Sequence, residues 1–501
     1  MLFTFETIYL GKNKSDHKSF HPQLPKKVKA LVAKPNKISV QKLDKDLSVS
    51  ADGSEAAPPA LRRSLGSWQV QLISIGAIIG SSYFLGLGEL ISQLGPSIVL
   101  AFALGGVIVW FVAMAMGELC AEMPREGSFV SFARELIGAP WAAGVGWSYW
   151  FDWCAYIASE MIGGGIILHQ FIPACPAMLW TAALGIVVSV LNLLDVKWFG
   201  AIDSAMSLIK ILAVAAFAFV GIAIYLGFAG NAGGVIHESS FFTAGKMTRE
   251  TLFPAGGLAV VLSMVIILVN YAGTEVISLA SAETDDPSKH VVRDCRRVAI
   301  SIVVLFVVPL LVLVSIFPYT QASLNQSVFS QALEHYGFKW AAAFFSFVAL
   351  TAAISCANSG LYGTVRALYG LGKEGLAPAM VTKLNRAAIP GVATWMTIAG
   401  CWGFFPLYVF FNGTAFYTWL LAVSGFTGAV CWLSISWSHL RFVKKRDGRA
   451  PLWCYASISL QLLCLGLIPF SKEFRGCLLI GIPVLVIPIL LVYWRRKKAS
   501  T

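Results

Sequence analysis

Residues 73–90 read ISIGAIIGSSYFLGLGEL, an apolar stretch that is interrupted by four glycines. A second interrupted stretch, VNYAGTEVISLASAE, occupies residues 269–283 and has Gly273 near its middle. Paired interruptions at corresponding places in two halves of a membrane protein indicate discontinuous helices around a central binding site. Glycine also occurs in membrane helices for packing alone, so the pairing carries more weight than either stretch by itself.

The composition places the chain in a membrane. Of its 501 residues, 57% are hydrophobic and only 13% are charged, and the mean hydropathy is +0.71. Soluble domains carry about 25% charged residues, so soluble enzymes, nucleic-acid-binding proteins and fibrous proteins are excluded. The ten cysteines are scattered and form no C-x-x-C pair. We therefore expect free buried thiols, no metal and no cofactor.

Twelve apolar stretches are long enough to span a bilayer, which takes roughly 20 residues. With no water to bond their backbone, they must be helical. The fold class predicted is an all-α polytopic membrane protein with twelve transmembrane helices, the first and sixth of them broken. The predicted spans are 69–92, 97–118, 140–171, 177–194, 204–227, 256–282, 297–318, 337–371, 391–411, 416–437, 451–470 and 476–494.

The basic residues predict the orientation. Only five of the 38 lysines and arginines fall in the loops that would be outside if the N-terminus is inside, and one more, Lys210, lies within a span. Basic residues are enriched on the cytoplasmic side of membrane proteins, so both termini are predicted to be cytoplasmic. We therefore expect a multi-pass protein of the cell membrane, in contact with the lipid bilayer and with no nucleic-acid partner.

Four regions follow from these patterns. Residues 1–61 form a polar, lysine-rich segment that predicts a disordered cytoplasmic tail, either solvated or held at an anionic membrane surface. The other regions are a first repeat of five helices (62–250), a second inverted repeat (251–440), and two extra helices with a basic cytoplasmic C-terminus (441–501).

Five segments, in this order, resemble amino acid permeases of the amino acid–polyamine–organocation superfamily, in its amino acid transporter branch. The segments are GAIIGSSYFLGLGELISQLGPS (76–97), GELCAEMPREGSFVSFARELIGAPWAAGVGWSYW (117–150), SLIKILAV (207–214), YAGTEVISLASAETDDPSK (271–289) and LTAAISCANSGLYGTVRALYGLGKEGLAP (350–378). The resemblance implies a fold of the LeuT type, with two inverted five-helix repeats. It also implies amino acid uptake with protons, or amino acid exchange, by alternating access.

Two stretches depart from the family's usual pattern. Where the family usually has Gly-Thr-Gly, the chain reads Gly80-Ser81-Ser82. Where it tends to have Phe-Ser-Phe-Gln-Gly-Thr-Glu, the chain keeps an aromatic residue at Tyr271 but has Val269-Asn270 before it. Both departures concern the substrate site.

A zwitterionic substrate at the membrane midplane needs partners for both charges, because an unpaired ion there costs several kcal/mol. A helix that resumes half-way offers free N–H groups where its dipole favours an anion. We therefore expect the N–H groups of Ser81, Ser82 and Tyr83 to bind the substrate carboxylate. Carbonyls beside the two interruptions would hold the ammonium, and Tyr271 either closes over the substrate or only packs. The candidates on this ammonium side are Ile78, Gly80, Val269, Asn270, Tyr271 and Gly273.

Ionisable residues inside spans are candidates for function. Asp152, Tyr156 and Glu160 recur at every fourth position of one span and so share a face. Tyr156 is expected nearest the substrate, whereas Glu160, which matches an acid of the family, either contacts substrate, relays protons or makes a structural hydrogen bond. Asp152 stands where relatives often have asparagine. Two acids at the site suggest a cationic substrate. Glu160, however, belongs to the general pattern of the family and so says little about which amino acid is bound.

Lys210 is predicted to couple protons, together with Glu160. It matches the family's lysine in the fifth span and stands where sodium-coupled relatives of this fold bind an ion between the first and eighth spans. A buried lysine exchanges its proton readily. The alternative is that Lys210 snorkels to the membrane interface and has no coupling role. Further candidates are Ser355 and Asn358, as a polar lining, and Glu275, as a brace of the sixth span.

Other charged residues are expected at helix ends. Glu118 and Glu122 are interpreted as loop braces or as partners of Arg125 and Arg134, and His169 is the one histidine expected close to a span. The leading functional hypothesis is a proton-coupled amino acid transporter and not an enzyme. An exchanger, or a nutrient receptor built on the same fold, remains an alternative.

Overall fold

A computed structural model describes residues 67–123, 128–193, 196–228, 248–281, 287–324, 326–385, 389–411, 414–471 and 474–500. The chain divides into two units, residues 1–58 and 59–501. The first unit, and with it the predicted N-terminal tail, lies outside the described residues.

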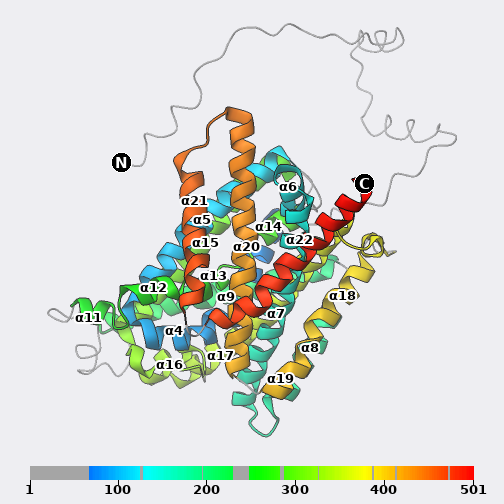
Figure 1. The fold of residues 1–501 in the computed structure, drawn as a ribbon. Helices are drawn as coiled ribbons and strands as arrows, with labels where there is room; N and C mark the ends of the chain where they lie inside the picture. Colours follow the sequence, from blue (N-terminus) through cyan, green and yellow to red (C-terminus); the bar gives the residue numbers. More distant parts are fainter. Residues whose placement is uncertain are drawn as a thin grey trace, which may run out of the picture. The chain divides into compact units, whose positions relative to one another are not determined.

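All regular structure in the described residues is helical (Figure 1). The longer helices are α3 (Ser67–Ile78), α5 (Ile98–Glu122), α7 (Ala139–Phe171), α8 (Ala177–Leu191), α9 (Val196–Tyr225), α15 (Pro287–Ile316), α17 (Lys339–Lys373), α18 (Gly391–Trp402), α20 (Thr414–Asp447), α21 (Leu452–Leu467) and α22 (Leu478–Ser500). The shorter ones are a π-helical turn (Ser82–Gly86), α4 (Leu87–Leu94), α6 (Ser128–Leu136), α11 (Arg249–Leu252), α12 (Gly257–Leu262), α13 (Met264–Val269), α14 (Val276–Ser281), α16 (Val328–His335) and α19 (Phe405–Phe411).

Eight helical segments of the described chain are long and apolar enough to cross a membrane. The protein is therefore a multi-pass membrane protein with an all-helical architecture, as predicted. Helix α7 has 33 residues but is less apolar, because it carries two acids and several tryptophans. The number of twelve spans and the inverted repeat stay predictions.

Two long helices begin earlier than their apolar stretches. Helix α9 starts at Val196 and α15 at Pro287, whereas the sequence predicted spans from residues 204 and 297. An α-helix bonds its own backbone groups and can continue outside the hydrocarbon. The basic group Arg293, Arg296 and Arg297 is therefore part of α15 and not of a loop.

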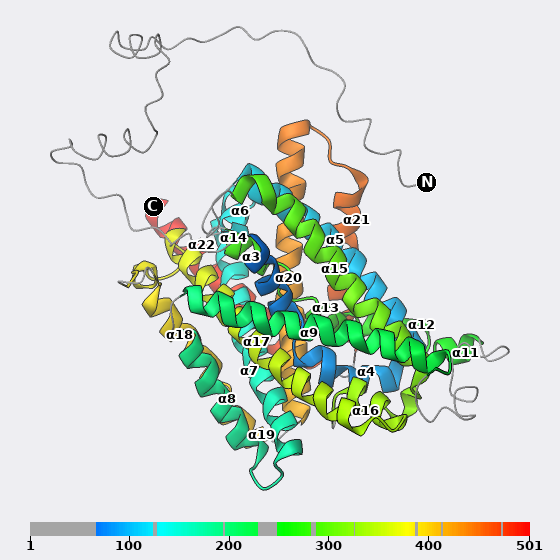
Figure 2. The same cartoon turned by 180° about the vertical axis from the view of Figure 1, so that it is seen from behind.

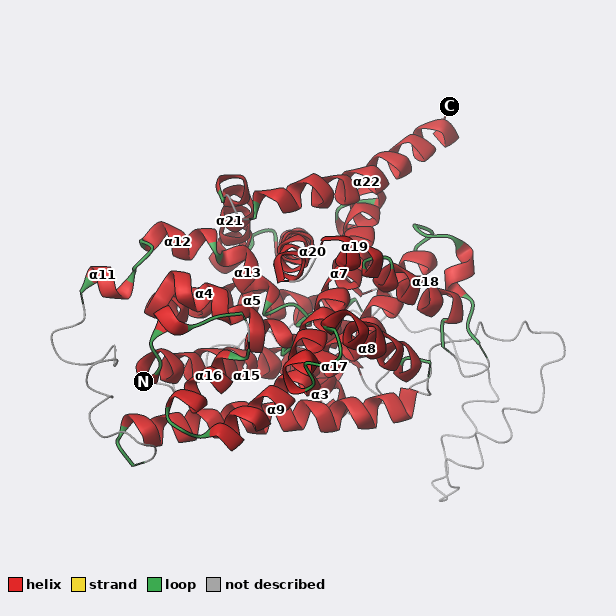
Figure 3. Cartoon of the chain, turned by 90° about the horizontal axis from the view of Figure 1, so that it is seen from below, coloured by secondary structure: helices red, strands yellow, loops and turns green. Residues whose placement is uncertain are grey.

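Helix α7 packs along both α17 and α20, and α22 also contacts it (Figure 3). Small residues allow these close contacts. A side chain at Gly360 of α17 would collide with the ring of Trp153 of α7, and one at Gly146 of α7 would collide with Leu371 of α17. Helix α9 runs across α3 and α17 on the other side of the bundle (Figure 2). This crossing places the middle of α9 against the end of α3.

Candidate substrate and coupling site

The first interruption separates α3, which ends at Ile78, from the helix that resumes at Ser81. The carbonyls released at the end of α3 already have partners within the protein. The ammonium of Lys210, which is fully buried, donates hydrogen bonds of 2.7 Å to the carbonyls of Gly76 and Ile79. The thiol of Cys356 donates to the carbonyl of Ala77 at 2.9 Å. Lys210 therefore faces the interruption rather than the membrane surface.

The resuming helix binds a carboxylate, as its free N–H groups predict, but that carboxylate belongs to the protein. The N–H of Ser81 donates to Oε2 of Glu160 at 2.6 Å, and Oε1 of Glu160 has no hydrogen-bond partner among the described residues. A side chain at Gly80 would collide with the same carboxylate. Glu160 thus occupies the position predicted for the substrate's carboxylate.

The serines and the tyrosine that follow Gly80 differ in their surroundings. The hydroxyl of Ser81 lies 3.2 Å from that of Tyr417, and the hydroxyl of Ser82 lies 3.0 Å from that of Tyr156. The side chain of Tyr83 points elsewhere, because its hydroxyl donates to two carbonyls of α15 at 3.2 and 3.1 Å. A contribution of Tyr83 to substrate binding through its backbone N–H stays a prediction.

The second interruption lies between α13, which ends at Val269, and α14, which begins at Val276. Its centre is Gly273, whose φ of +102° favours glycine. A side chain there would also lie 2.9 Å from the carbonyl carbon and oxygen of Ala77 in α3. The two interruptions are therefore in direct main-chain contact, although the sequence separates them by almost two hundred residues.

Side chains of the second interruption are held in place by hydrogen bonds. The hydroxyl of Tyr271 donates to the carbonyl of Phe102 at 2.7 Å, and the amide of Asn270 donates to the carbonyl of Ile266 at 2.9 Å, which leaves Oδ1 of Asn270 without a described partner. Glu275 accepts from its own turn, at the N–H of Gly273 (3.2 Å). It braces the turn, as its position suggested.

The structure adds Asp203, which the sequence analysis did not single out. It is fully buried in α9, seven residues before Lys210, and accepts hydrogen bonds from three residues of α17. The donors are Ser355 (3.0 Å), Asn358 (3.4 Å) and Ser359 (2.6 Å). Lys210 interacts electrostatically with both Asp203 and Glu160. The predicted polar lining by Ser355 and Asn358 thus surrounds an acid.

One expectation about charged residues was wrong, and for Glu118 one of the two alternatives, a pair with Arg134, is not what the described residues show. Arg134 pairs with Glu374 at 2.7 Å, and Glu118 pairs with Arg446 at 2.9 Å and with His439 at 2.7 Å; Arg125, the other expected partner, lies outside the described residues. His439 is buried in α20, so His169 is not the one histidine at a span. His439 lies two residues beyond the predicted apolar stretch 416–437, but α20 continues to Asp447 and so includes it.

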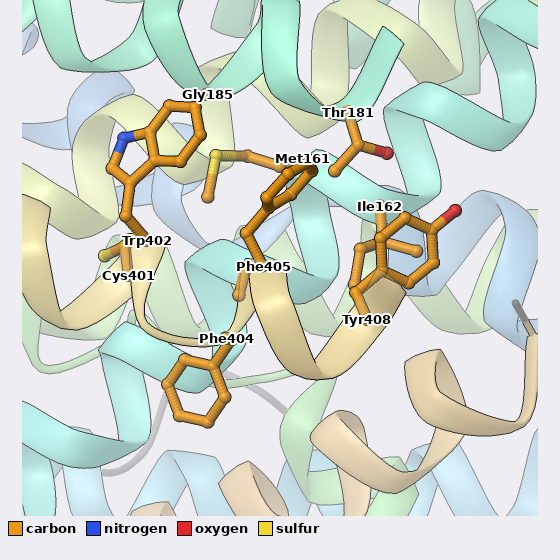
Figure 4. A pocket seen from close by; sticks show the side chains of 10 residues that line it. Met161, Ile162, Thr181, Gly185, Cys401, Trp402, Phe404, Phe405 and Tyr408 are labelled. Carbon is orange, nitrogen blue, oxygen red and sulfur yellow. The ribbon is translucent and has the colours of Figure 1, made fainter. Parts of the chain in front are cut away.

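A separate cavity lies between α7, α8, α18 and α19 (Figure 4). Its empty volume is about 270 Å³, and no charged residue lines it. It offers no oppositely charged partner for an ammonium or a carboxylate, and its lining shares no residue with the site described above. Among the described residues, no group of three His, Cys, Asp or Glu could hold a metal ion.

Comparison with known proteins gives a family match over most of the chain. The sequence model for amino acid permeases matches residues 69–468. The amino-acid permease RocC of Bacillus subtilis is 32% identical over 85% of this chain and 93% of its own. The lysine-specific permease LysP of Escherichia coli is 34% identical over 77% of this chain and 79% of its own. The γ-aminobutyric acid permease of Bacillus subtilis is 32% identical over 88% of this chain and 95% of its own.

Proposed function

The chain belongs to the amino acid permease family, and we propose that it imports an amino acid across the cell membrane by proton-coupled alternating access. The observation that carries the proposal is the pair of opposite charges at one helix interruption. Lys210 donates to the carbonyls on one side of Gly80, and Glu160 accepts from the N–H on the other side.

An amino acid presents the same two groups that the interruption now binds. Its carboxylate can replace Glu160 at the N–H of Ser81, because both are carboxylates and the helix end favours an anion. Its ammonium can bind carbonyls of the two interruptions, which lie in contact through Ala77 and Gly273. Substrate binding and the position of Glu160 are thereby linked.

This exchange of carboxylates links substrate binding to the uptake of a proton. Once the substrate takes the N–H of Ser81, an ionised Glu160 would lose its hydrogen bond inside a water-excluded bundle, where an unpaired ion costs several kcal/mol. Glu160 then either takes up a proton or pairs with Lys210. Lys210 and Glu160 bind opposite sides of the same interruption, and Asp203 lies seven residues before Lys210 in α9. This proximity supports a proton that moves among the three groups.

The finer architecture belongs to this proposal. Twelve spans in a LeuT-type arrangement, with two inverted repeats of five, would put each interruption in the first helix of its repeat. The contact between the two interruptions supports such a pseudo-symmetric centre. Both termini are proposed to be cytoplasmic, on the basis of the basic residues.

Uptake of labelled amino acids into proteoliposomes under an imposed pH gradient tests the function. We expect Lys210→Ala to abolish gradient-driven accumulation while exchange of labelled for unlabelled amino acid continues. Lys210→Arg should also fail, because a guanidinium hardly ever releases its proton.

The control is Lys444→Ala, which removes a basic residue from the exposed end of α20 and should leave accumulation unchanged. If the Lys210→Ala protein accumulates substrate in proportion to the gradient, Lys210 is a structural cation and the coupling mechanism is wrong. If the wild-type protein exchanges amino acids but never accumulates them, it is an exchanger.

A further inference from the structure

Tyr417 of α20 reaches the first interruption, although the sequence analysis did not single it out. The residue is 1% exposed, and its hydroxyl lies 3.2 Å from the hydroxyl of Ser81. The N–H of Ser81 binds the carboxylate of Glu160 and, in the proposed function, the carboxylate of the substrate. A tyrosine hydroxyl therefore adjoins the residue to which the substrate is proposed to bind.

A glycine makes room for this tyrosine. A side chain at Gly163 of α7 would lie 2.6 Å from the hydroxyl oxygen of Ser81 and 3.3 Å from the ring of Tyr417. The hydroxyl of Tyr417 is also next to the π-helical turn, since a side chain at Gly86 would lie 3.6 Å from it. The ring of Tyr417 is thus enclosed between α7 and the resuming helix, and its hydroxyl lies at the start of that helix.

The hydroxyl of Ser81 lies between Tyr417 and a carboxylate. Both it and the hydroxyl of Tyr156 lie beside the carboxylate of Glu160. A hydroxyl has one proton to donate and two lone pairs that accept. When Ser81 donates its proton to the carboxylate, its oxygen can accept from Tyr417. The chain from Tyr417 through Ser81 to the carboxylate uses both protons, and successive hydrogen bonds in such a chain strengthen one another.

Ser81 has another way to use its proton. A serine in or near a helix commonly donates to a carbonyl of the preceding turn, and its proton then points away from a ligand at the helix start. A donor on the far side of the oxygen restricts the rotation of the hydroxyl. Tyr417 is in the position of that donor, because its hydroxyl is within hydrogen-bond distance of the Ser81 oxygen.

We propose that Tyr417 is a positioning residue for the carboxylate of the substrate: it donates to the hydroxyl of Ser81 and so turns the Ser81 proton toward the bound carboxylate. The inference rests on the proposed transport function and adds a residue of α20 to its site. The N–H and the hydroxyl of Ser81 then bind the substrate together. Because charge-assisted hydrogen bonds are roughly twice as strong as neutral ones, this arrangement selects a carboxylate over an uncharged carbonyl group.

An amino acid and its carboxamide provide the test, because the carboxamide keeps the side chain and the ammonium but has no negative charge. The probe is the labelled amino acid, among the twenty of proteins, that wild-type protein takes up best into proteoliposomes. Both compounds are offered at about pH 6, where their amino groups are protonated. For wild-type protein, we expect the inhibition constant of the carboxamide to exceed the KM of the acid at least about tenfold.

Tyr417→Phe removes only the hydroxyl of the tyrosine. We expect it to raise the KM of the acid about fivefold, with the inhibition constant of the carboxamide and the maximal rate both within about twofold of wild type. The matched control is Tyr336→Phe. Tyr336 is also buried, and its hydroxyl donates to the carbonyl of Ile316, away from the interruption. Its loss should leave the acid and the carboxamide as in wild type.

The outcomes separate this inference from the proposed function. If Tyr417→Phe weakens acid and carboxamide alike, or changes only the maximal rate, Tyr417 is a structural residue; the inference is then wrong and the transport function stands. The same holds if the carboxamide competes as well as the acid in wild-type protein. If wild-type protein takes up no amino acid at all, the proposed function itself fails.

If the Tyr417→Phe protein does not insert, Gly163→Ala decides. Its new methyl group presses on the hydroxyl of Ser81 and on the ring of Tyr417, so it should separate the two hydroxyls without removing either. We expect the same selective loss of the acid. An unchanged ratio of acid to carboxamide in this variant would overturn the inference.

Discussion

Two buried aspartates, Asp203 and Asp152, lie in different regions of the bundle and have opposite surroundings. Asp203 accepts hydrogen bonds from three side chains of α17 and lies near Lys210. Asp152 lies against Ser424 and Thr427 of α20, and its Oδ1 has no hydrogen-bond partner among the described residues. Helix packing therefore satisfies both oxygens of Asp203 but leaves one oxygen of Asp152 without a partner among the described residues.

The donors to Asp203 explain why that region is architectural. Ser355, Asn358 and Ser359 are spaced three and four residues apart, so they share one face of α17. A carboxylate opposite such a face is satisfied whenever α9 and α17 are packed together. Asp152 has a smaller set on α20, where Ser424 and Thr427 lie beside its carboxylate and Gly428 stands opposite Oδ2.

The largest effect is expected at the interruption between these two regions. Gly80→Leu should reduce transport to background, because even a Cβ at this position would displace the Glu160 carboxylate and press on Cys356 (Sγ at 2.9 Å). Uptake in proteoliposomes measures it, with insertion checked by size-exclusion chromatography.

The matched control is Gly466→Leu in α21. Gly466 is exposed on the described helices, and a Cβ there meets nothing within 4 Å, so transport should persist. Normal uptake by the Gly80→Leu protein would show that no ligand approaches the backbone at this interruption.

The fold and part of the site could be predicted from sequence because they depend on local patterns. The apolar stretches gave the helical membrane architecture, and the glycines of residues 73–90 and 269–283 located both interruptions. Lys210 stood out as a lysine within an otherwise apolar predicted span. Each of these features is visible within one or two turns of helix.

Other features depend on where helices end and on contacts between distant residues. Asp203 lies one residue before the predicted stretch 204–227, and so it resembled an acid at the membrane surface. Because α9 continues back to Val196, Asp203 is in fact deep in the bundle. That Glu160 would occupy the N–H of Ser81 also could not be predicted, since it requires the register of α7 against the first interruption.

A smaller effect is expected when the satisfied acid is removed. Asp203→Ala leaves three buried donors without an acceptor and should lower the free energy of unfolding by about 3 kcal/mol. Thermal or denaturant unfolding in detergent measures the loss, and Asp203→Asn, which keeps one acceptor oxygen, should lose less. Unchanged stability of the alanine variant would mean that α9 and α17 do not depend on this carboxylate.

The smallest effect on stability is expected at Asp152, and it completes the comparison. Asp152→Asn has nearly the same shape and removes a buried carboxylate whose Oδ1 has no described partner, so we expect the free energy of unfolding to change by about 1 kcal/mol or less. If Asp152→Asn is instead as unstable as Asp203→Ala, Asp152 is architectural too, and the contrast between the two regions does not hold.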